Sequence, residues 1–442
     1  MERAPRIDEN PADLSEAQTA EELAACVGAY IASRLDRRIA GRGRQPDEER
    51  ARPDDRRILT VYNRLVVPPA GFRASTPAII DAAGRLWGYD NRPSLPEEIV
   101  RFAAGGRVRT ASVGRLESFA RCPYQHFARH MLRLTRRPKA EVTPLESGLL
   151  SHKALEILMQ EGVPPPDRGA IDQRLQEVFK RIEKDPSLLA FLVTPGGRFR
   201  WHNTRSRLRR FLEVETLRLA GSEFRPSEFE REFGTSATPP LKIPLPDGGM
   251  LLLRGRIDRI DTAGSGPATE ALVIDYKSGT LTNKGRPVDL ERGHDLQLAV
   301  YLLVVQEVLG MEPFGALYAP VLPRPAGEAS RDPENPLDVK LIGLVPTDEG
   351  DRVTGGRNLL RGSRSSVKTH SELLSLLQEA RDTLALYAGA LSRGRIDVAP
   401  VKIGGRAPCE FCEFKPLCRV DEMYNPFRSS PKDGLGEREG DR

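Results

Sequence analysis

The chain has 442 residues, of which 39% are hydrophobic and 29% are charged, and its formal net charge at pH 7 is +5. This composition indicates a soluble globular protein of two or three domains, and no apolar run approaches the ~20 residues that a membrane-spanning helix needs. The first residues are polar and charged and lack the pattern of a secretory signal, so we expect a cytoplasmic location.

The first 110 residues are predicted to carry no catalytic group. Residues 1–57 are dense in charge and contain one expected helix followed by a linker. Cys26 lies near the apolar stripe of this helix and is interpreted as structural. Residues 58–110 are expected to form a strand over Ile58–Val67 and an irregular accessory region.

A capped helix is predicted directly after this region. Ser112 can cap a helix over Val113–Arg121, and the Cys-Pro-Tyr step at Cys122–Tyr124 interrupts it.

Two segments are rich in basic residues. Arg101–Lys139 holds ten Lys or Arg and one acidic residue, and Arg198–Arg210 holds six Arg and no acid. Arginines beside an aromatic ring suit a surface that follows the phosphates of a single strand and stacks on its bases. The candidate DNA-binding residues are Arg198, Arg200, Trp201 and Arg205. A solvated helix face is the open alternative.

A candidate metal ligand lies on the next amphipathic helix, predicted over Glu146–Glu161. Gly148 and His152 are four residues apart on one face of it. A neutral imidazole is a good ligand for a transition metal, whereas a histidine satisfied in the core or at the surface is the alternative. Further on, an expected edge strand carries Glu230, which either lies near the metal or covers the strand edge.

Two short apolar segments, Leu251–Ile260 and Ala271–Lys277, are separated by a turn and are predicted to pair as a hairpin. Asp275 and Lys277 project from one side of the second strand, and Asp258 is a charge inside the first. Such a charge is costly unless something binds it. Two carboxylates and a lysine at a strand end suit a divalent metal ion in phosphodiester hydrolysis, with an incidental surface salt bridge as the alternative.

A long helix is predicted over Arg292–Leu309. It carries Gln297 and Tyr301 four residues apart, and a buried amide and phenol must find hydrogen-bond partners. The alternatives are a polar seam between packed helices and a motif that shapes the site. A strand over Phe314–Leu322 then continues the sheet as a βαβ unit, so the expected fold class is α/β.

The cysteines gather near the end of the chain. Cys409, Cys412 and Cys418 have the spacing C-x2-C-x5-C, and an odd total of five argues against a disulfide framework. A four-ligand site needs one more thiol, and Cys122 is the plausible one.

Taken together, these motifs resemble those of the PD-(D/E)XK nuclease superfamily, and more narrowly its RecB/AddB-like branch. The matching motifs, in family order, are the Cys-Pro-Tyr step, G-x-x-x-H, G-x-I-D, D-x-K, Q-x-x-x-Y and the terminal cysteines. The resemblance covers about Ser112–Asp421. It implies a restriction-endonuclease-like core, a central mixed sheet flanked by helices with a helical insertion, over residues 111–424, and we expect a disordered tail over residues 425–442.

The resemblance also implies roles for single residues. The implied ligands of Mg²⁺ or Mn²⁺ are His152, Asp258, Asp275 and the carbonyl of Tyr276. Lys277 would position or deprotonate the attacking water, and Gln297 and Tyr301 would shape the site. Glu230 is a further candidate near the metal.

The cysteine pattern resembles the iron–sulfur staple of AddB-type and CRISPR-adaptation nucleases. It implies a 4Fe–4S cluster on Cys122, Cys409, Cys412 and Cys418. Such a cluster would pin the two ends of the domain together and remove entropy from the unfolded chain. A zinc knuckle made by the terminal triplet is the alternative.

The implied function is a metal-dependent DNA nuclease, acting as an exonuclease on single-stranded ends in repair or recombination with a helicase partner. The chain contains no G-x-x-x-x-G-K-[ST] sequence, so we do not expect it to drive resection with ATP by itself. A CRISPR-adaptation-type trimming exonuclease and a non-catalytic DNA-binding subunit are the alternatives. The intact His152, Asp258, Asp275 and Lys277 argue against the latter.

Overall fold

The computed structural model describes residues 108–135, 144–245, 248–266, 269–279, 281, 284–321, 340–360, 367–403, 405–420, 425, 427–433 and 435. The expectations for residues 1–107 therefore lie outside the described residues. Apart from Asn425, the described residues belong to one compact unit, which comprises Pro93–Val420 and Phe427–Arg442.

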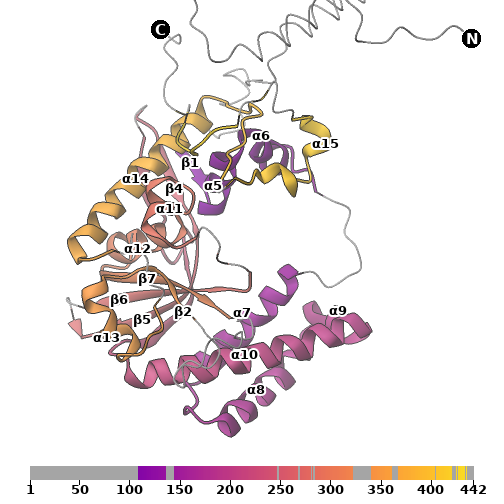
Figure 1. Cartoon of the computed structure of the whole chain (residues 1–442), viewed down its shortest axis with the longest axis vertical. Coiled ribbons are helices and arrows are strands. Elements are labelled where there is room, and N and C mark those ends of the chain that lie inside the picture. Colours follow the sequence, from indigo (N-terminus) through magenta and orange to yellow (C-terminus); the bar gives the residue numbers. More distant parts are fainter. Residues whose placement is uncertain are drawn as a thin grey trace, which may run out of the picture. The chain divides into compact units, whose positions relative to one another are not determined.

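A five-stranded mixed sheet lies at the centre of this unit (Figure 1). In spatial order its strands are β2 (Arg225–Phe233), β5 (Gly255–Ala263), β6 (Glu270–Lys277), β7 (Glu312–Pro320) and β8 (Ile342–Leu344). β6 and β7 pair in parallel, and the other three neighbouring pairs are antiparallel. The predicted hairpin is confirmed in β5 and β6, and the predicted βαβ unit in β6, α12 (Gln297–Glu307) and β7.

Strand β6 is buried on both faces, as a central strand between two helical layers should be. Ala271 and Val273 join one apolar core, whereas Leu272, Ile274 and Tyr276 join the other. The alternation of side chains therefore places the odd-numbered residues, Asp275 and Lys277 included, on the face that α12 covers.

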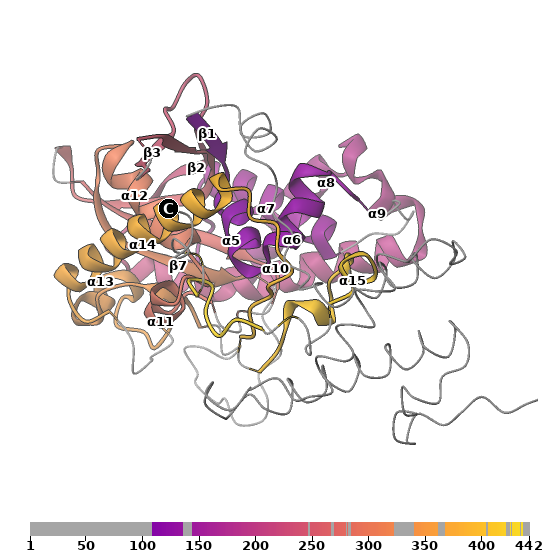
Figure 2. The ribbon, with the colours of Figure 1, turned by 90° about the horizontal axis from the view of Figure 1, so that it is seen from above.

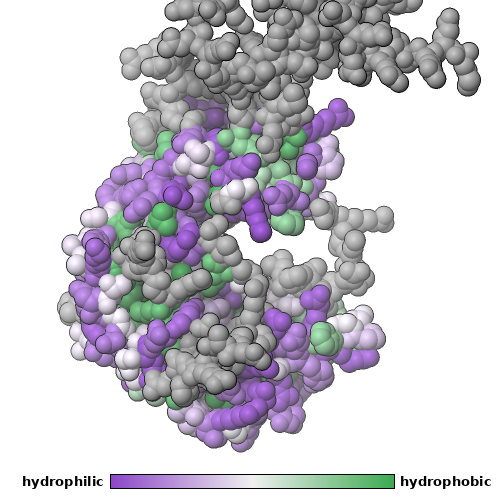
Figure 3. Space-filling view, in the orientation of Figure 1, coloured by the Kyte–Doolittle hydropathy of each residue, from purple (hydrophilic) through white to green (hydrophobic). Residues whose placement is uncertain are grey.

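Helices form a layer on each face of the sheet (Figures 1 and 2). The first core includes residues of α5 (Val113–Arg121), α12 and α14 (His370–Ser392). The second includes residues of α7 (Pro144–Gln160), α8 (Arg168–Ile182), α9 (Leu189–Val193) and α10 (Pro195–Gly221). Several of these helices start at a side-chain cap, namely Asp167, Thr194 and Thr369. The outward surface of α8 to α10 is largely hydrophilic, and the surface is hollowed between these helices and the part that carries α5 (Figure 3).

A second, three-stranded sheet has the order β1 (Val108–Ala111), β4 (Met250–Leu253) and β3 (Leu241–Pro244). The first predicted strand of the hairpin is thus divided: β4 belongs to the small sheet and β5 to the large one, and Arg254 lies between them. Gly234, with φ +79°, allows this passage, because a Cβ there would lie 2.4 Å from the Cβ of Arg254.

The remaining described elements are short. They are α6 (Pro123–His126), a π-helical turn (Phe127–Met131), α11 (Pro287–Glu291), α13 (Gly350–Thr354), α15 (Lys415–Cys418) and 3₁₀ turns at Pro186–Leu188, Thr347–Glu349 and Pro408–Glu410. The helix expected from Arg292 begins only at Gln297. None of the helices in the described part of the chain is long and apolar enough to cross a membrane.

The expectation of a disordered tail is wrong for residues 427–433 and 435. Arg428 donates hydrogen bonds to the carbonyls of Ala120 and Ala399, and Leu435 is fully buried in the first core. The polar composition concealed this packing, because one arginine supplies most of the anchoring hydrogen bonds.

Candidate active site

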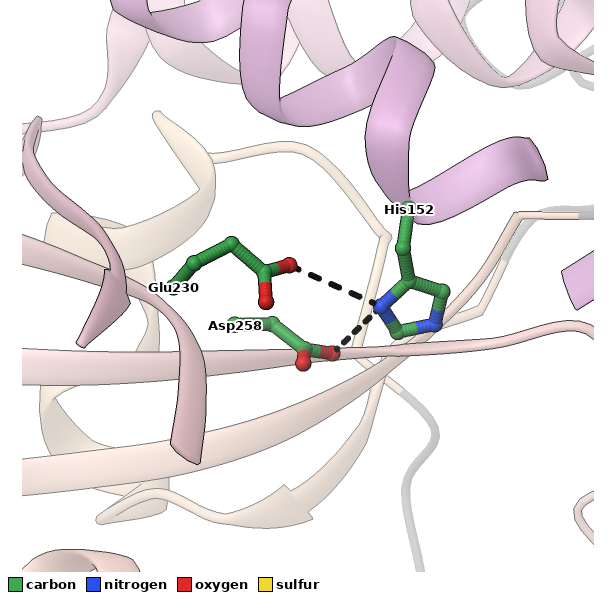
Figure 4. Close-up of side chains that lie close together, drawn as sticks. All are labelled: His152, Glu230 and Asp258. Carbon is green, nitrogen blue, oxygen red and sulfur yellow. Dashed lines mark ion pairs between the residues drawn. The ribbon is translucent and has the colours of Figure 1, made fainter. Parts of the chain in front are cut away.

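Three side chains converge where α7 meets the strand pair β2–β5 (Figure 4). Nδ1 of His152 lies 3.4 Å from Oδ2 of Asp258 and 4.0 Å from Oε1 of Glu230. One ligand atom from each of these residues lies within 4.8 Å of the other two. One imidazole and two carboxylates form a donor set that suits a divalent cation such as Mn²⁺ or Mg²⁺.

Helix α7 approaches the end of β6 closely at Gly148. A Cβ at Gly148 would lie 3.1 Å from Oγ of Ser278, which directly follows β6. His152 lies one turn further along the same face of α7, so the same approach of the helix brings it towards the strand ends. The G-x-x-x-H spacing thus has a packing reason as well as a chemical one.

Glu230 occupies a strained position opposite Asp258. Its φ is +47°, a conformation that costs a non-glycine residue about 1–3 kcal/mol. Its neighbours on β2 pair with the two residues that flank Asp258, so the two carboxylates face each other across the strands. Burial, followed by the charge of Asp258, raises the pKa of Glu230. Nε of Arg256 lies 2.7 Å from Oε2 of Glu230 and offsets part of this repulsion.

Asp275 lies beside this group and is 1% exposed. The last pair between β5 and β6 is Arg259 with Ile274, so Asp258 and Asp275 follow on the facing strands. Burial, followed by the charge of Asp258, raises the pKa of Asp275 to about 7. Nζ of Lys277 lies 2.5 Å from Oδ2 of Asp275, although this oxygen accepts no hydrogen bond of good geometry within the described residues.

Gln297, the first residue of α12, links these groups. Its Nε2 donates to Oδ1 of Asp275 and to the hydroxyl of Tyr301, each at 2.8 Å. Its Oε1 accepts a hydrogen bond from Nζ of Lys277 at 3.0 Å. The structure therefore brings together the predicted residues His152, Glu230, Asp258, Asp275, Lys277, Gln297 and Tyr301.

The local charges fit a divalent cation. Three carboxyl groups, those of Glu230, Asp258 and Asp275, lie close together beside the cations of Lys277 and Arg256. Burial lowers the pKa of His152, but the hydrogen bond to Asp258 and the surrounding carboxylates raise it overall. A bound cation would relieve the repulsion that raises the two carboxyl pKa values.

Tyr276 contacts the site through its backbone N–H, which donates to Oδ2 of Asp258 at 2.8 Å. Its ring lies on the other face of β6, edge-on to His152 with the centroids 5.9 Å apart. Its hydroxyl accepts a hydrogen bond from Arg259 at 2.8 Å.

A buried ionic network lies behind the site. It consists of Arg259 and Asp261 on β5 and Glu215 and Arg218 on α10. Glu215 accepts from both arginines, at 2.6 Å from Arg259 and 2.8 Å from Arg218. None of these four residues was predicted from the sequence to have a role. A signal was present for Arg259 and Asp261, because they are charged residues next to the apolar residues Ile257 and Ile260, as Asp258 is.

Another set of residues supports Lys277 and was also missed. Its Nζ lies 4.9 Å from the centroid of the Tyr318 ring, a cation–π contact. The hydroxyl of Tyr318 donates to Oδ1 of Asp295 at 2.7 Å, and Oδ2 of Asp295 accepts from the backbone N–H of Gly285 at 2.7 Å. These partners come from three segments, so no local pattern could reveal them.

The four described cysteines line one hollow. It is bordered by Cys122, Cys409, Cys412 and Cys418, together with Tyr124, Gln125, Val398, Pro400, Pro408, Lys415 and Val420. Nε2 of Gln125 lies 3.6 Å from Sγ of Cys412. Burial, followed by the neighbouring thiols of Cys418 and Cys412, raises the pKa of Cys409 to about 11. No three of these described sulfurs lie within 4.8 Å of one another.

The predicted DNA-binding residues lie at the start of α10 and divide into two kinds. Arg198 and Arg200 are exposed and Arg205 is partly exposed. Trp201 is only 8% exposed and packs edge-on against Phe179, with the centroids 5.0 Å apart. The expectation that Trp201 stacks on bases is therefore wrong, because its ring fills the core of the helical layer.

A family model described as the PD-(D/E)XK nuclease superfamily matches residues 110–419. Since the match spans most of the chain, the chain belongs to this superfamily, and the resemblance seen in the motifs is confirmed.

Similar curated proteins are named as a subunit of an ATP-dependent helicase/deoxyribonuclease. The protein of Symbiobacterium thermophilum is 28% identical over 411 residues, covering 83% of this chain and 34% of the relative. The protein of Geobacillus kaustophilus is 31% identical over 408 residues, covering 83% of this chain and 34% of the relative. The protein of Exiguobacterium sibiricum is 29% identical over 461 residues, covering 95% of this chain and 38% of the relative. The chain thus spans about a third of the length of these relatives.

Proposed function

We propose that this chain is a metal-dependent deoxyribonuclease that hydrolyses phosphodiester bonds at single-stranded ends during DNA repair or recombination in the cytoplasm. The observation that carries this proposal is the convergence of His152, Glu230 and Asp258 beside the buried pair Asp275 and Lys277. The names of the relatives support DNA as the substrate and a separate helicase as the partner.

The proposed ligands of one Mg²⁺ or Mn²⁺ ion are His152, Asp258, Asp275 and the carbonyl of Tyr276, with Glu230 as a further carboxylate nearby. When bound, the ion supplies Lewis-acid chemistry to the phosphate and to a water molecule. The N–H of Tyr276 holds Asp258 in place, and the edge of the Tyr276 ring limits the rotation of His152.

Lys277 is proposed to hold the attacking water or a phosphate oxygen. Its ammonium is fixed between Oδ2 of Asp275, Oε1 of Gln297 and the ring of Tyr318, and an ammonium offers three donors. Gln297 orients Asp275 and Lys277 together, and Tyr301 fixes the amide of Gln297. Tyr301 and Gln297 are therefore proposed as positioning residues.

The test is digestion of end-labelled single-stranded DNA with Mg²⁺ or Mn²⁺ by the wild type and Lys277→Ala. Loss of cleavage in the variant, with short products released from one end and no cutting of circular single strands, is the expected result. Equal cleavage by both proteins would mean that another nuclease is present, and would overturn the proposal. Cutting of circular strands would overturn only the exonuclease mode.

We further propose that Cys122, Cys409, Cys412 and Cys418 hold a 4Fe–4S cluster that joins α5 to the end of the domain. All four thiols border one hollow, which supports a single shared group held by the four of them.

Anaerobic purification with a visible absorption spectrum and an iron assay tests the cluster. The expected protein is brown and contains iron, and Cys412→Ser lowers both the colour and the iron content. A colourless protein loaded with zinc would contradict the iron–sulfur proposal and leave the nuclease proposal intact.

A further inference from the structure

Three arginines from separate segments lie near enough to the start of α5 to repel one another electrostatically, and none has an anionic partner among the described residues. Arg115 lies in the first turn of α5, Arg133 follows the π-helical turn, and Arg254 precedes β5. The backbone N–H of Arg254 donates to the carbonyl of Ala111 at 3.0 Å, which places Arg254 beside the cap residue Ser112. Arg133 and Arg254 are exposed and Arg115 is partly buried.

The positive charges of this arginine cluster (Arg115, Arg133 and Arg254) are not neutralised by the part of the chain that the structure describes. No carboxylate there lies within ion-pair distance of any of the three guanidinium groups. Burial, followed by the charges of Arg254 and Arg133, lowers the pKa of Arg115, as expected where cations crowd together. Elsewhere arginines such as Arg352 are surrounded by carboxylates.

The histidines beneath the cluster do not supply the missing charge. Nε2 of His126 accepts a hydrogen bond from Nε of Arg115 at 3.3 Å, so the imidazole is neutral. Burial, followed by Arg115, lowers the pKa of His126 to about 3. Nδ1 of His126, a side chain that is 1% exposed, has no hydrogen-bond partner in the described part of the chain. His126 therefore adds neither a compensating negative charge nor a further positive charge to the cluster.

The first turn of α5 favours negative charge. It contains no acidic residue, and the side chain of Ser112 does not cap it. Free N–H groups and the dipole at a helix N-terminus favour negative charge. Gly114, in the same turn, leaves open space where a side chain would begin.

The cluster is close enough to the nuclease site to contact the same strand of DNA. Arg254 precedes Asp258 by four residues, so their Cα atoms are separated by no more than about 14 Å. At the rise of about 3.4 Å per nucleotide in a duplex strand, this distance corresponds to about four nucleotides or fewer. Gly234 and Arg254 are in contact at the end of the strand pair that carries Glu230 and Asp258.

We propose that Arg115, Arg133 and Arg254 form a subsite for a backbone phosphate of the DNA strand, within about four nucleotides of the bond that is cut. This inference rests on the proposed nuclease function. It assigns the cluster a role in holding the strand, because phosphate contacts position a nucleic acid without reading its sequence.

The test is metal-free binding of a short single strand by the full chain as a function of salt concentration. The variant Arg133→Gln/Arg254→Gln changes only exposed side chains, and Arg115→Gln is measured separately. Lys180→Gln/Lys184→Gln, on α8 and just after its end, is the control with the same change of charge, since both lysines are exposed. If the double variant no longer neutralises this one phosphate, the slope of log K against log salt falls by about 0.7 for a single strand.

A second measurement locates the contact. Neutral methylphosphonate groups are placed one at a time near the cut site, and the affinity of each strand is measured. In the wild type, one or two positions within about four nucleotides of the cut weaken binding, whereas the arginine variant is insensitive there. At saturating DNA the variant cleaves at the wild-type rate, and only its KM rises.

If the arginine variant has the same salt slope and the same methylphosphonate pattern as the wild type, the inference is wrong. An acidic protein partner would then be the remaining candidate to bind the arginines. An equal loss in the lysine control also overturns it, because the effect would then follow net charge. Neither binding measurement needs cleavage. If wild type and Lys277→Ala cleave equally, the nuclease proposal fails while the salt slope still decides on the subsite.

Discussion

Asp258 and Arg259 are neighbours on β5, yet they belong to opposite kinds of charged environment. Arg259 belongs to a buried ionic network, in which its guanidinium pairs with the carboxylates of Glu215 and Asp261. All three side chains are buried. Asp258 faces two further carboxyl groups and raises the pKa of both. The charges of the network are paired with one another, whereas the carboxyl groups of the candidate site repel one another. The candidate site therefore differs from the neighbouring ionic network in that its carboxylate charges are only partly compensated.

The largest expected effect is on catalysis. Lys277→Ala should lower the rate of DNA cleavage by about 10²- to 10⁴-fold, because the site loses the donor that holds water or phosphate. End-labelled DNA and a thermal melt measure activity and folding together. Lys284→Ala is the matched control, since its ammonium lies 6.0 Å from the same Tyr318 ring. If Lys284→Ala loses as much activity, a general loss of positive charge explains the result.

Mutations in the buried ionic network should lower the free energy of unfolding rather than act directly on catalysis. Glu215→Gln leaves Arg218 and Arg259 without their shared carboxylate, and breaking a buried pair costs about 3–5 kcal/mol. Urea unfolding measures this loss. Glu213→Gln on the same helix is the control, because its pairs with Arg168 and Arg209 are long and should contribute less than about 1 kcal/mol. Equal losses of unfolding free energy in Glu215→Gln and Glu213→Gln would show that the buried network stabilises the fold no more than partly exposed ion pairs do.

Metal binding should stabilise the wild type, and this stabilisation should depend on Asp258. Mn²⁺ at 100 times its dissociation constant should stabilise the wild type by about 2.7 kcal/mol, seen as a rise in melting temperature. Asp258→Asn should lose this rise. Without metal, Asp258→Asn should be at least as stable as the wild type, because one of the mutually repelling carboxylates is gone. A metal-free variant that is clearly less stable would show that Asp258 has a structural role.

The smallest expected effect concerns α10. Trp201→Phe should cost about 1 kcal/mol in unfolding free energy, since the Trp201 ring packs against Phe179 and Phe191. It should leave DNA affinity unchanged. Arg200→Gln, at an exposed position of the same helix, should lower the salt slope of binding by about 0.7 if this surface follows DNA. A large loss of affinity in Trp201→Phe alone would restore the base-stacking role.

Sequence patterns determined the parts of the site that depend on local spacing. The period of two on β6 placed Asp275 and Lys277 on one face, and the four-residue spacings set His152 with Gly148 and Gln297 with Tyr301. The hairpin of β5 and β6 was predicted from short apolar segments bounded by turn residues. Ordered motifs also identified the superfamily, because each motif carries its own chemical constraint.

Tertiary structure decided which charges are compensated. Within GRIDRID the charged residues look alike in the sequence, and only α10 supplies the partners of Arg259 and Asp261. Trp201 showed the same limit, because a ring among arginines is either a platform or a core residue depending on what packs against it. The arginine cluster around Arg115 is assembled from three separate segments. The pairing of charges, the burial of a ring and the assembly of a cluster all depend on contacts between residues far apart in the chain. Local sequence patterns do not reveal such contacts.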